Sequence, residues 1–147
     1  MFGLSWRPFS PEEEQRILQA IAEAEMQTSG EIRVHVDKWC KTNPLFKAKN
    51  TFIHLKMDAT KLRNGVLIYV AKQEKKFAIL GDVGISEKVP AEFWESTKDI
   101  MRTEFAKGDQ VAAISFGIAE AGKQLKKHFP YDAGTDENEL PDTISYG

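Results

Sequence analysis

The sequence has little cysteine and no excess of charge of either sign, and each absence excludes a class of protein. Its 147 residues contain one cysteine, Cys40, so an internal disulfide and a thiolate-rich zinc site are excluded. The 20 Lys and Arg residues nearly balance the 22 Asp and Glu residues, whereas nucleic-acid binding needs a clustered excess of positive charge. We therefore expect no nucleic acid among its partners.

Long apolar runs are also absent, and no segment is apolar enough to predict a membrane span. Residues 1–8 lack the apolar core and the small-residue cleavage site of a secretory signal. These absences predict a cytoplasmic protein with no membrane span of its own.

The apolar residues that are present suffice for one domain. They make up 41% of the chain, which is enough for a single core, and we expect one domain over residues 1–130. Residues 131–147 are acidic and rich in Gly, Pro and Asp, and therefore predict a loosely ordered tail. Its carboxylates could bind a cation, but we expect them to be solvated: Asp136, Glu137, Glu139 and Asp142.

Helical spacing of apolar residues predicts four helices. The first follows Ser10-Pro11-Glu12-Glu13, a capping box with proline at the first helical position, and ends near Gln27. The others are expected over 44–57, 90–108 and 111–125. In the helix over 44–57, an apolar stripe is expected to face the core: Leu45, Phe46, Phe52, Ile53 and Leu55.

Three strands are expected. Residues 31–36 alternate, with Arg33, His35 and Asp37 on the polar face, which predicts a half-exposed strand toward a sheet edge. Residues 66–71 are apolar throughout, as in a central strand that helices cover on both faces. Residues 76–80 form a hairpin with them. A right-handed crossover makes the first two strands parallel, so the sequence predicts an α/β fold, a three-layer α/β/α sandwich with a small mixed β-sheet.

Three polar segments that contain glycine fall at one edge of this predicted sheet: Thr28–Glu31, Arg63–Gly65 and Gly81–Gly84. Glycine permits tight turns or close approach of the backbone to a ligand. Converging carboxylates must keep a proton or hold a cation between them. Calcium (Ca²⁺) takes six to eight oxygen ligands, and the predicted metal ligands at this edge are Glu31, Asp58, Asn64 and Asp82.

Structural roles remain open for the same residues. Glu31 could pair with an arginine, Asn64-Gly65 could be a turn with positive φ, and Asp82 could stabilise the turn to Gly84. Arg63 could instead bind a phosphate or carboxylate. A second set, His35, Asp37 and Cys40, could mimic a nucleophilic site near the opposite edge, but we expect these to be surface residues.

With these residues laid out, the chain resembles the TPM domain family of thylakoid-lumen and bacterial proteins. The resemblance spans about residues 10–128 and rests on three ordered blocks: TSGEIRV from Thr28, RNGVLI from Arg63 and GDVGI from Gly81. It implies an α/β/α sandwich, and calcium or other divalent-cation binding in some members. It also implies acid phosphatase activity, attributed to plant relatives, and roles in photosystem repair or membrane-protein assembly.

Residues and resemblance together favour a non-enzymatic domain that binds a divalent cation and acts as an interaction or assembly module, with membrane-associated proteins as partners. Glu31, Asn64 and Asp82 coincide with the family's motifs, and Asp58 and Arg63 are weaker members of the pocket. The alternative is an acid phosphatase, in which the metal and Arg63 hold the phosphate of a monoester.

Overall fold

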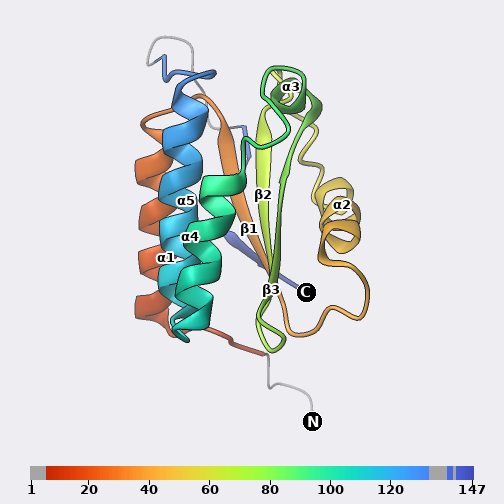
Figure 1. Cartoon of the computed structure of the whole chain (residues 1–147), viewed down its shortest axis with the longest axis vertical. Coiled ribbons are helices and arrows are strands. Elements are labelled where there is room, and N and C mark those ends of the chain that lie inside the picture. Colours follow the sequence, from red (N-terminus) through yellow and green to blue (C-terminus); the bar gives the residue numbers. More distant parts are fainter. Residues whose placement is uncertain (1–5, 133–138, 141) are drawn as a thin grey trace.

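The computed structural model describes residues 6–132, 139–140 and 142–147. Its centre is a four-stranded sheet with the strand order β3-β2-β1-β4 (Figure 1). The strands are β1 (Glu31–Asp37), β2 (Gly65–Ala71), β3 (Lys76–Gly81) and β4 (Ile144–Tyr146). β1 pairs in parallel with β2, and β2 pairs antiparallel with β3, which confirms the predicted crossover and hairpin.

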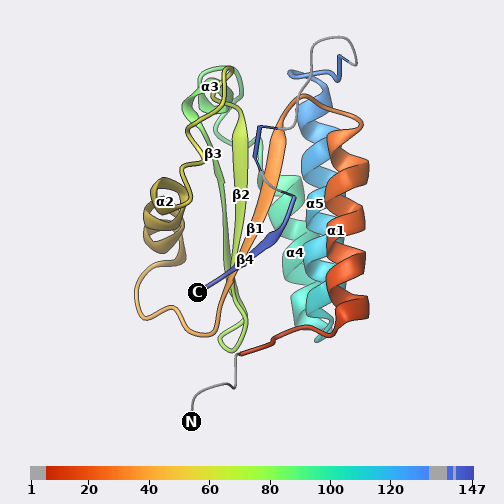
Figure 2. The same ribbon diagram turned by 180° about the vertical axis from the view of Figure 1, so that it is seen from behind.

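Helices cover both faces of the sheet. On one face lie α1 (Pro11–Glu25), α4 (Glu95–Ala106) and α5 (Gln110–Lys126), and on the other lies α2 (Pro44–His54). The short α3 (Val83–Ser86) follows β3. Figure 2 shows the same three layers from behind. The fold is therefore the predicted α/β/α sandwich with a small mixed sheet.

Local sequence explains where the first helix begins and how the core forms. Ser10 accepts a hydrogen bond from the backbone N–H of Glu13, and the Glu13 side chain accepts one from the N–H of Ser10, as the capping box requires. Apolar side chains of α1 and α5 then pack on one face of the sheet, and every residue of β2 is buried. Burial on both sides is what the unbroken apolar run of residues 66–71 predicts.

The segment after residue 130 differs from the prediction of a loose tail. Ile144–Tyr146 forms β4, in parallel register with Val34–Val36, and Leu140 is buried. Composition averaged over the acidic segment conceals this short run of strand-forming residues. Residues 133–138 and 141, which include the predicted tail carboxylates Asp136 and Glu137, lie outside the described residues.

β4, rather than β1, forms the edge of the sheet, so the predicted edge position of β1 is wrong. β1 lies between β2 and β4. His35 and Asp37, expected at the surface, are 7% and 5% exposed. The alternation in residues 31–37 correctly places these two side chains on one face of the strand. It does not show that residues 144–147 pack beside that face and help to bury it.

Helix α2 departs from the prediction in two ways. It ends at His54 rather than Met57, and its outer side exposes Leu45, Phe46 and Ile53. The inward residues include Ala48, Thr51 and Phe52. The helix is apolar on two sides, so spacing alone does not identify the buried side. Among the described residues, no helix is long and apolar enough to cross a membrane.

Candidate functional site

The three predicted glycine segments meet at one edge of the sheet, where β1 and β2 begin and β3 ends; we call it the Glu31 edge. The backbone N–H of Glu31 donates to the carbonyl of Asn64 at 3.3 Å, and that of Asp82 donates to Gly65 at 2.9 Å. Asn64, which is buried, donates from its side-chain Nδ2 to the carbonyl of Ser29 at 3.1 Å. The structure thus joins segments that are far apart in the chain.

Asp82 and Arg63 form an ion pair on the β3 side of the Glu31 edge. Two guanidinium nitrogens of Arg63 donate to the two carboxylate oxygens of Asp82, at 2.7 and 2.9 Å. Asp82 also accepts from the backbone N–H of Val83 at 2.7 Å and so caps α3. Both oxygens of this buried carboxylate therefore already have donors.

Backbone conformation at this turn decides one of the structural alternatives. Arg63, with a φ of 51°, takes the left-handed conformation, whereas Asn64 and Gly65 do not. Gly84 lies so close to the preceding loop that an added Cβ would be 2.1 Å from the carbonyl oxygen of Leu62. Close approach of two backbone segments is the reason for glycine at this position.

Glu31 lies on the β1 side of the same edge and faces the end of the chain. Its carboxylate accepts a hydrogen bond from the backbone N–H of Leu140 at 2.6 Å. Burial raises the pKa of Glu31 to about 7; backbone hydrogen bonds from Leu140 and Glu139 oppose this effect, and the adjacent Glu139 carboxyl group adds to it. Glu139 is exposed and also accepts from the N–H of Lys61.

A second carboxyl pair lies beside the first. Glu25, at the end of α1, accepts from the backbone N–H of Ile32 at 3.0 Å. β4 pairs with β1 only from Val34 onward, so Glu25 satisfies a strand donor that β4 does not reach. Burial, together with a hydrogen bond to the Asp142 carboxyl group, raises the pKa of Glu25 to about 8, although the hydrogen bond from the Ile32 N–H opposes this effect. Two carboxyl groups that share a hydrogen bond must hold a proton between them.

The four predicted ligands do not form one compact set. Asp58 is exposed. Glu31 and Asp82 stand on opposite sides of β2, so their backbones are about 10 Å apart at the usual strand spacing. Among the described residues, no group of three or more His, Cys, Asp or Glu side chains is placed to hold a metal ion. The ligand roles of Glu31, Asp58, Asn64 and Asp82 stay predictions.

Sequence reasoning missed Glu25 and treated Glu139 and Asp142 as solvated. Glu25 occupies an ordinary polar position near the end of an amphipathic helix, and no spacing links it to a residue 117 positions later. A strand prediction for residues 144–146 was the signal that could have brought the end of the chain to β1 and its acidic residues to the Glu31 edge.

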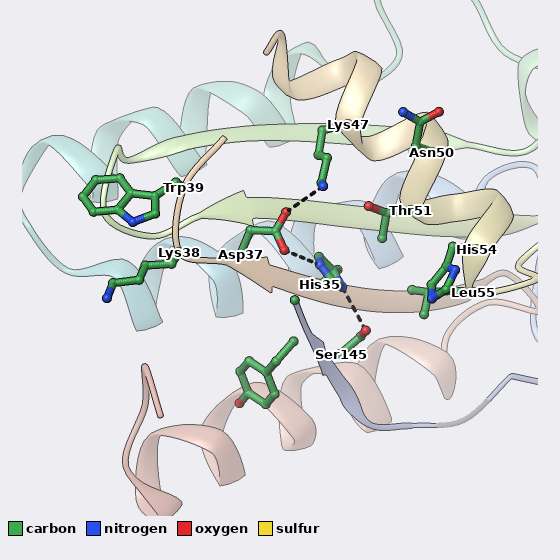
Figure 3. Close-up of a pocket in the computed structure, with 12 residues that line it drawn as sticks. His35, Asp37, Lys38, Trp39, Lys47, Asn50, Thr51, His54, Leu55 and Ser145 are labelled. Atoms are coloured by element: carbon green, nitrogen blue, oxygen red, sulfur yellow. Dashed lines mark hydrogen bonds and ion pairs between the residues drawn. The ribbon is translucent and has the colours of Figure 1, made fainter. Parts of the chain in front are cut away.

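A cavity of about 540 Å³ opens between α2 and the β1–β4 half of the sheet; we call it the His35 cavity (Figure 3). α2 packs mainly against β2 and β3, which leaves a cavity between α2 and the β1–β4 half of the sheet; His35 and Asp37, at its wall, are nevertheless buried. The polar residues that line the cavity include His35 and Asp37 from β1, Ser145 from β4, and Lys47, Thr51 and His54 from α2.

Polar side chains on the sheet side of the cavity form a continuous network. His35 Nδ1 is 2.8 Å from Ser145 Oγ, and His35 Nε2 is 2.7 Å from Asp37 Oδ1. The Tyr69 hydroxyl donates to Asp37 Oδ2 at 2.6 Å. Burial lowers the pKa of His35, although the Asp37 carboxylate opposes this effect. The expectation of surface residues is therefore wrong for His35 and Asp37.

Cys40, the third member of that predicted set, is also buried rather than at the surface. Its Sγ is 3.1 Å from the carbonyl oxygen of Thr42. Ser145 takes the place beside His35 that the sequence offered to Cys40. Sequence analysis did not consider Ser145 because residues 131–147 were predicted to be a loosely ordered tail.

Solved structures support the same fold. The chain is 43% identical to the BA42 protein of the psychrophilic bacterium Bizionia argentinensis, with a TM-score of 0.91 over 99% of this chain and 100% of that one. The N-terminal domain of the cg2496 protein of Corynebacterium glutamicum has a TM-score of 0.62 at 11% identity, over 93% of this chain and 80% of that one, and this likeness concerns the fold alone. No curated protein matches.

The family comparison covers most of the chain. The TPM domain matches residues 7–124, which run from the residues before α1 almost to the end of α5. This range contains the three glycine segments that meet at the Glu31 edge. The chain belongs to the TPM domain family.

Proposed function

We propose that this protein binds a divalent cation, calcium among them, at the Glu31 edge and acts as an interaction or assembly module. The observation that carries the proposal is the presence of two adjacent carboxyl pairs, Glu31 with Glu139 and Glu25 with Asp142. Each pair brings together groups that repel one another when both are ionised. A divalent cation removes that repulsion by replacing the shared proton.

The chemistry of the edge suits a hard cation. Carboxylates, backbone carbonyls and water are the ligands that Ca²⁺ and Mg²⁺ prefer. Glu139 and Asp142 are exposed, so their side chains can turn toward an ion without unpacking the core. Glu31 is the predicted ligand that also belongs to one of the two carboxyl pairs. Asp82 is a weaker candidate because Arg63 already neutralises it.

Cation binding at these pairs would stabilise the position of residues 139–140 and 142–147 against β1. Glu139 and Asp142 lie within five residues of the start of β4, whereas Glu25 and Glu31 belong to α1 and β1. An ion held between the two groups would therefore fasten β4 to β1. A partner that contacts β4 would then bind in a cation-dependent way.

Exposed apolar side chains support the interaction role. Phe46 and Ile53 are seven residues apart on α2, so they lie on the same side of the helix, and they are 57% and 67% exposed. An exposed apolar strip of this kind is typical of a protein-binding surface. A membrane-associated protein is the partner that we propose. In the predicted cytoplasmic location, free calcium is low, and magnesium would be the usual occupant.

Calorimetric titration with calcium and with magnesium tests the proposal. We expect saturable binding by the native chain and at least tenfold weaker binding by Glu31→Gln and Glu139→Gln. Glu87→Gln, which changes an exposed carboxylate beyond α3, should bind like the native chain. Equal affinity of Glu31→Gln and the native chain would contradict the proposal.

The acid phosphatase alternative needs a cation that is free to bind phosphate. Arg63 donates two hydrogen bonds to Asp82, so a phosphate group would have to displace that carboxylate. The cation-binding proposal therefore ranks first. Turnover of a phosphomonoester by the native chain, and its loss in Arg63→Gln with the fold retained, would reverse this order.

A further inference from the structure

We propose that the His35 cavity is a hydrolytic site for small carboxylic esters, in which Ser145 is the nucleophile and His35 is its general base. Asp37 and Tyr69 act as positioning residues for His35. This site is separate from the Glu31 edge, because it lies between α2 and the β1–β4 half of the sheet, and the inference does not depend on cation binding.

Sheet register places these groups side by side. His35 pairs with Tyr69 on β2 and with Ser145 on β4, so the three side chains form a row on the same face of neighbouring strands. Asp37 is two residues further along β1 and therefore shares that face. The rings of His35 and Tyr69 stack with centroids 5.9 Å apart, which fixes the orientation of the imidazole.

Hydrogen bonding to Asp37 determines which nitrogen of His35 carries the proton. The Asp37 carboxylate accepts from the Tyr69 hydroxyl and stands 2.7 Å from His35 Nε2. An ionised carboxylate can only accept, so Nε2 must be the protonated nitrogen. The unprotonated Nδ1 then accepts from the Ser145 hydroxyl at 2.8 Å. This is the arrangement that a general base and a nucleophilic serine require.

The cavity gives a substrate access to the serine. Ser145 is half-buried, and Figure 3 shows its side chain beside His35, with Lys47 extending from α2 toward Asp37. The Lys47 ammonium is 3.9 Å from Asp37 Oδ2 and so pairs with the carboxylate that orients His35. Lys38 lies on the same lining. With both Lys38 and Lys47 on its lining, the cavity favours an ester that carries a negative charge.

The reaction divides into two balanced steps. In the first, His35 Nδ1 takes the Ser145 proton as Oγ bonds to the acyl carbon; the ester C–O bond breaks, and the alcohol leaves with that proton. In the second, His35 takes a proton from water, the hydroxide bonds to the acyl carbon, and the bond between the acyl carbon and Ser145 Oγ breaks as Oγ regains the proton. The products are an alcohol and a carboxylic acid, and nothing is oxidised or reduced.

Covalent labelling is the direct test, because it reads out the nucleophile itself. The folded full chain, with chelator present, is treated with a fluorophosphonate and with p-nitrophenyl acetate. We expect one adduct, assigned to Ser145 by peptide mass spectrometry, and release of p-nitrophenol. Ser145→Ala should lose the adduct and at least a hundredfold in rate while keeping the native melting temperature. The matched control is Ser86→Ala, at an exposed serine beyond the other end of the sheet, and it should react like the native chain.

The pH dependence of the hydrolysis rate distinguishes a catalytic role of His35 from a purely structural one. The charged and titratable groups near His35 are Asp37 and Arg33 on β1, Tyr69 on β2 and Lys47 on α2, and His54 also lines the cavity. We expect the rate to rise with pH and to level off below the ordinary pKa of histidine, and His35→Gln to remove that dependence. Asp37→Asn should lower the rate more than Asp37→Glu does.

Three outcomes would overturn the inference. The first is the absence of both adduct and turnover, and the second is labelling that persists in Ser145→Ala. The third is release of p-nitrophenol from p-nitrophenyl phosphate, assayed in parallel, but not from p-nitrophenyl acetate.

Discussion

Replacing Glu25 with glutamine separates the effect of its charge from the effect of its hydrogen bonds. Glutamine has nearly the same shape, and its side-chain oxygen can still accept from the backbone N–H of Ile32. It cannot ionise beside Asp142. Any change in the pH dependence of stability therefore reports the carboxyl pair.

The sign and size of the effect follow from the raised pKa of Glu25. A carboxyl group with a pKa of about 8 in the folded chain and 4.5 when unfolded binds its proton more tightly in the folded state. The folded state is thus favoured fully below pH 4.5, and this contribution is lost as pH rises toward 8. At about 1.4 kcal/mol per pH unit, the upper limit is about 5 kcal/mol. Partial solvent screening reduces the expected value to about 1–3 kcal/mol.

Urea unfolding at pH 5 and at pH 9, with chelator present, measures this difference. Relative to the native chain, Glu25→Gln should gain about 1–3 kcal/mol in free energy of unfolding between pH 5 and pH 9. Glu87→Gln, at an exposed carboxylate, should show no such gain. A Glu25→Gln variant whose stability falls with pH as steeply as that of the native chain would refute the reasoning.

Three further changes have defined outcomes. Arg63→Gln leaves the buried Asp82 carboxylate without its cation and should lower the free energy of unfolding, measured in urea; an unchanged midpoint would mean that Val83 alone satisfies Asp82. Gly84→Ala places a methyl group against the carbonyl of Leu62 and should cost more than about 2 kcal/mol, which a thermal melt would detect. Deletion of residues 142–147 uncovers the edge of β1 and should produce concentration-dependent association in sedimentation experiments; a monomeric truncated chain would contradict this expectation.

The sequence predicted the layers of the fold because its clearest patterns are local. The capping box at Ser10 begins α1, and the unbroken apolar run of residues 66–71 identifies the central strand. The connections then determine that β1 and β2 are parallel and that β3 runs antiparallel to β2. Each of these inferences depends on neighbouring residues or on a single short connection.

The parts that the sequence did not predict depend on contacts between distant segments. The pairing of His35 with Ser145 joins residues 110 positions apart. The same approach of the chain end brings Glu139 to Glu31. Three strand residues within an acidic segment carry little signal, because strand pairing is decided by the partner surface rather than by local propensity. The surface interpretation of His35 failed for this reason.

Backbone amide spectra recorded during a calcium titration test the proposed function most directly. The account predicts saturable shifts at Glu25, at Glu31-Ile32 and at the described residues 139–140 and 142, with no comparable shifts around Glu87. The same shifts should be weak in Glu31→Gln. A silent titration, or shifts confined to residues 58–63 and 82–84, would contradict a cation site built on these carboxyl pairs.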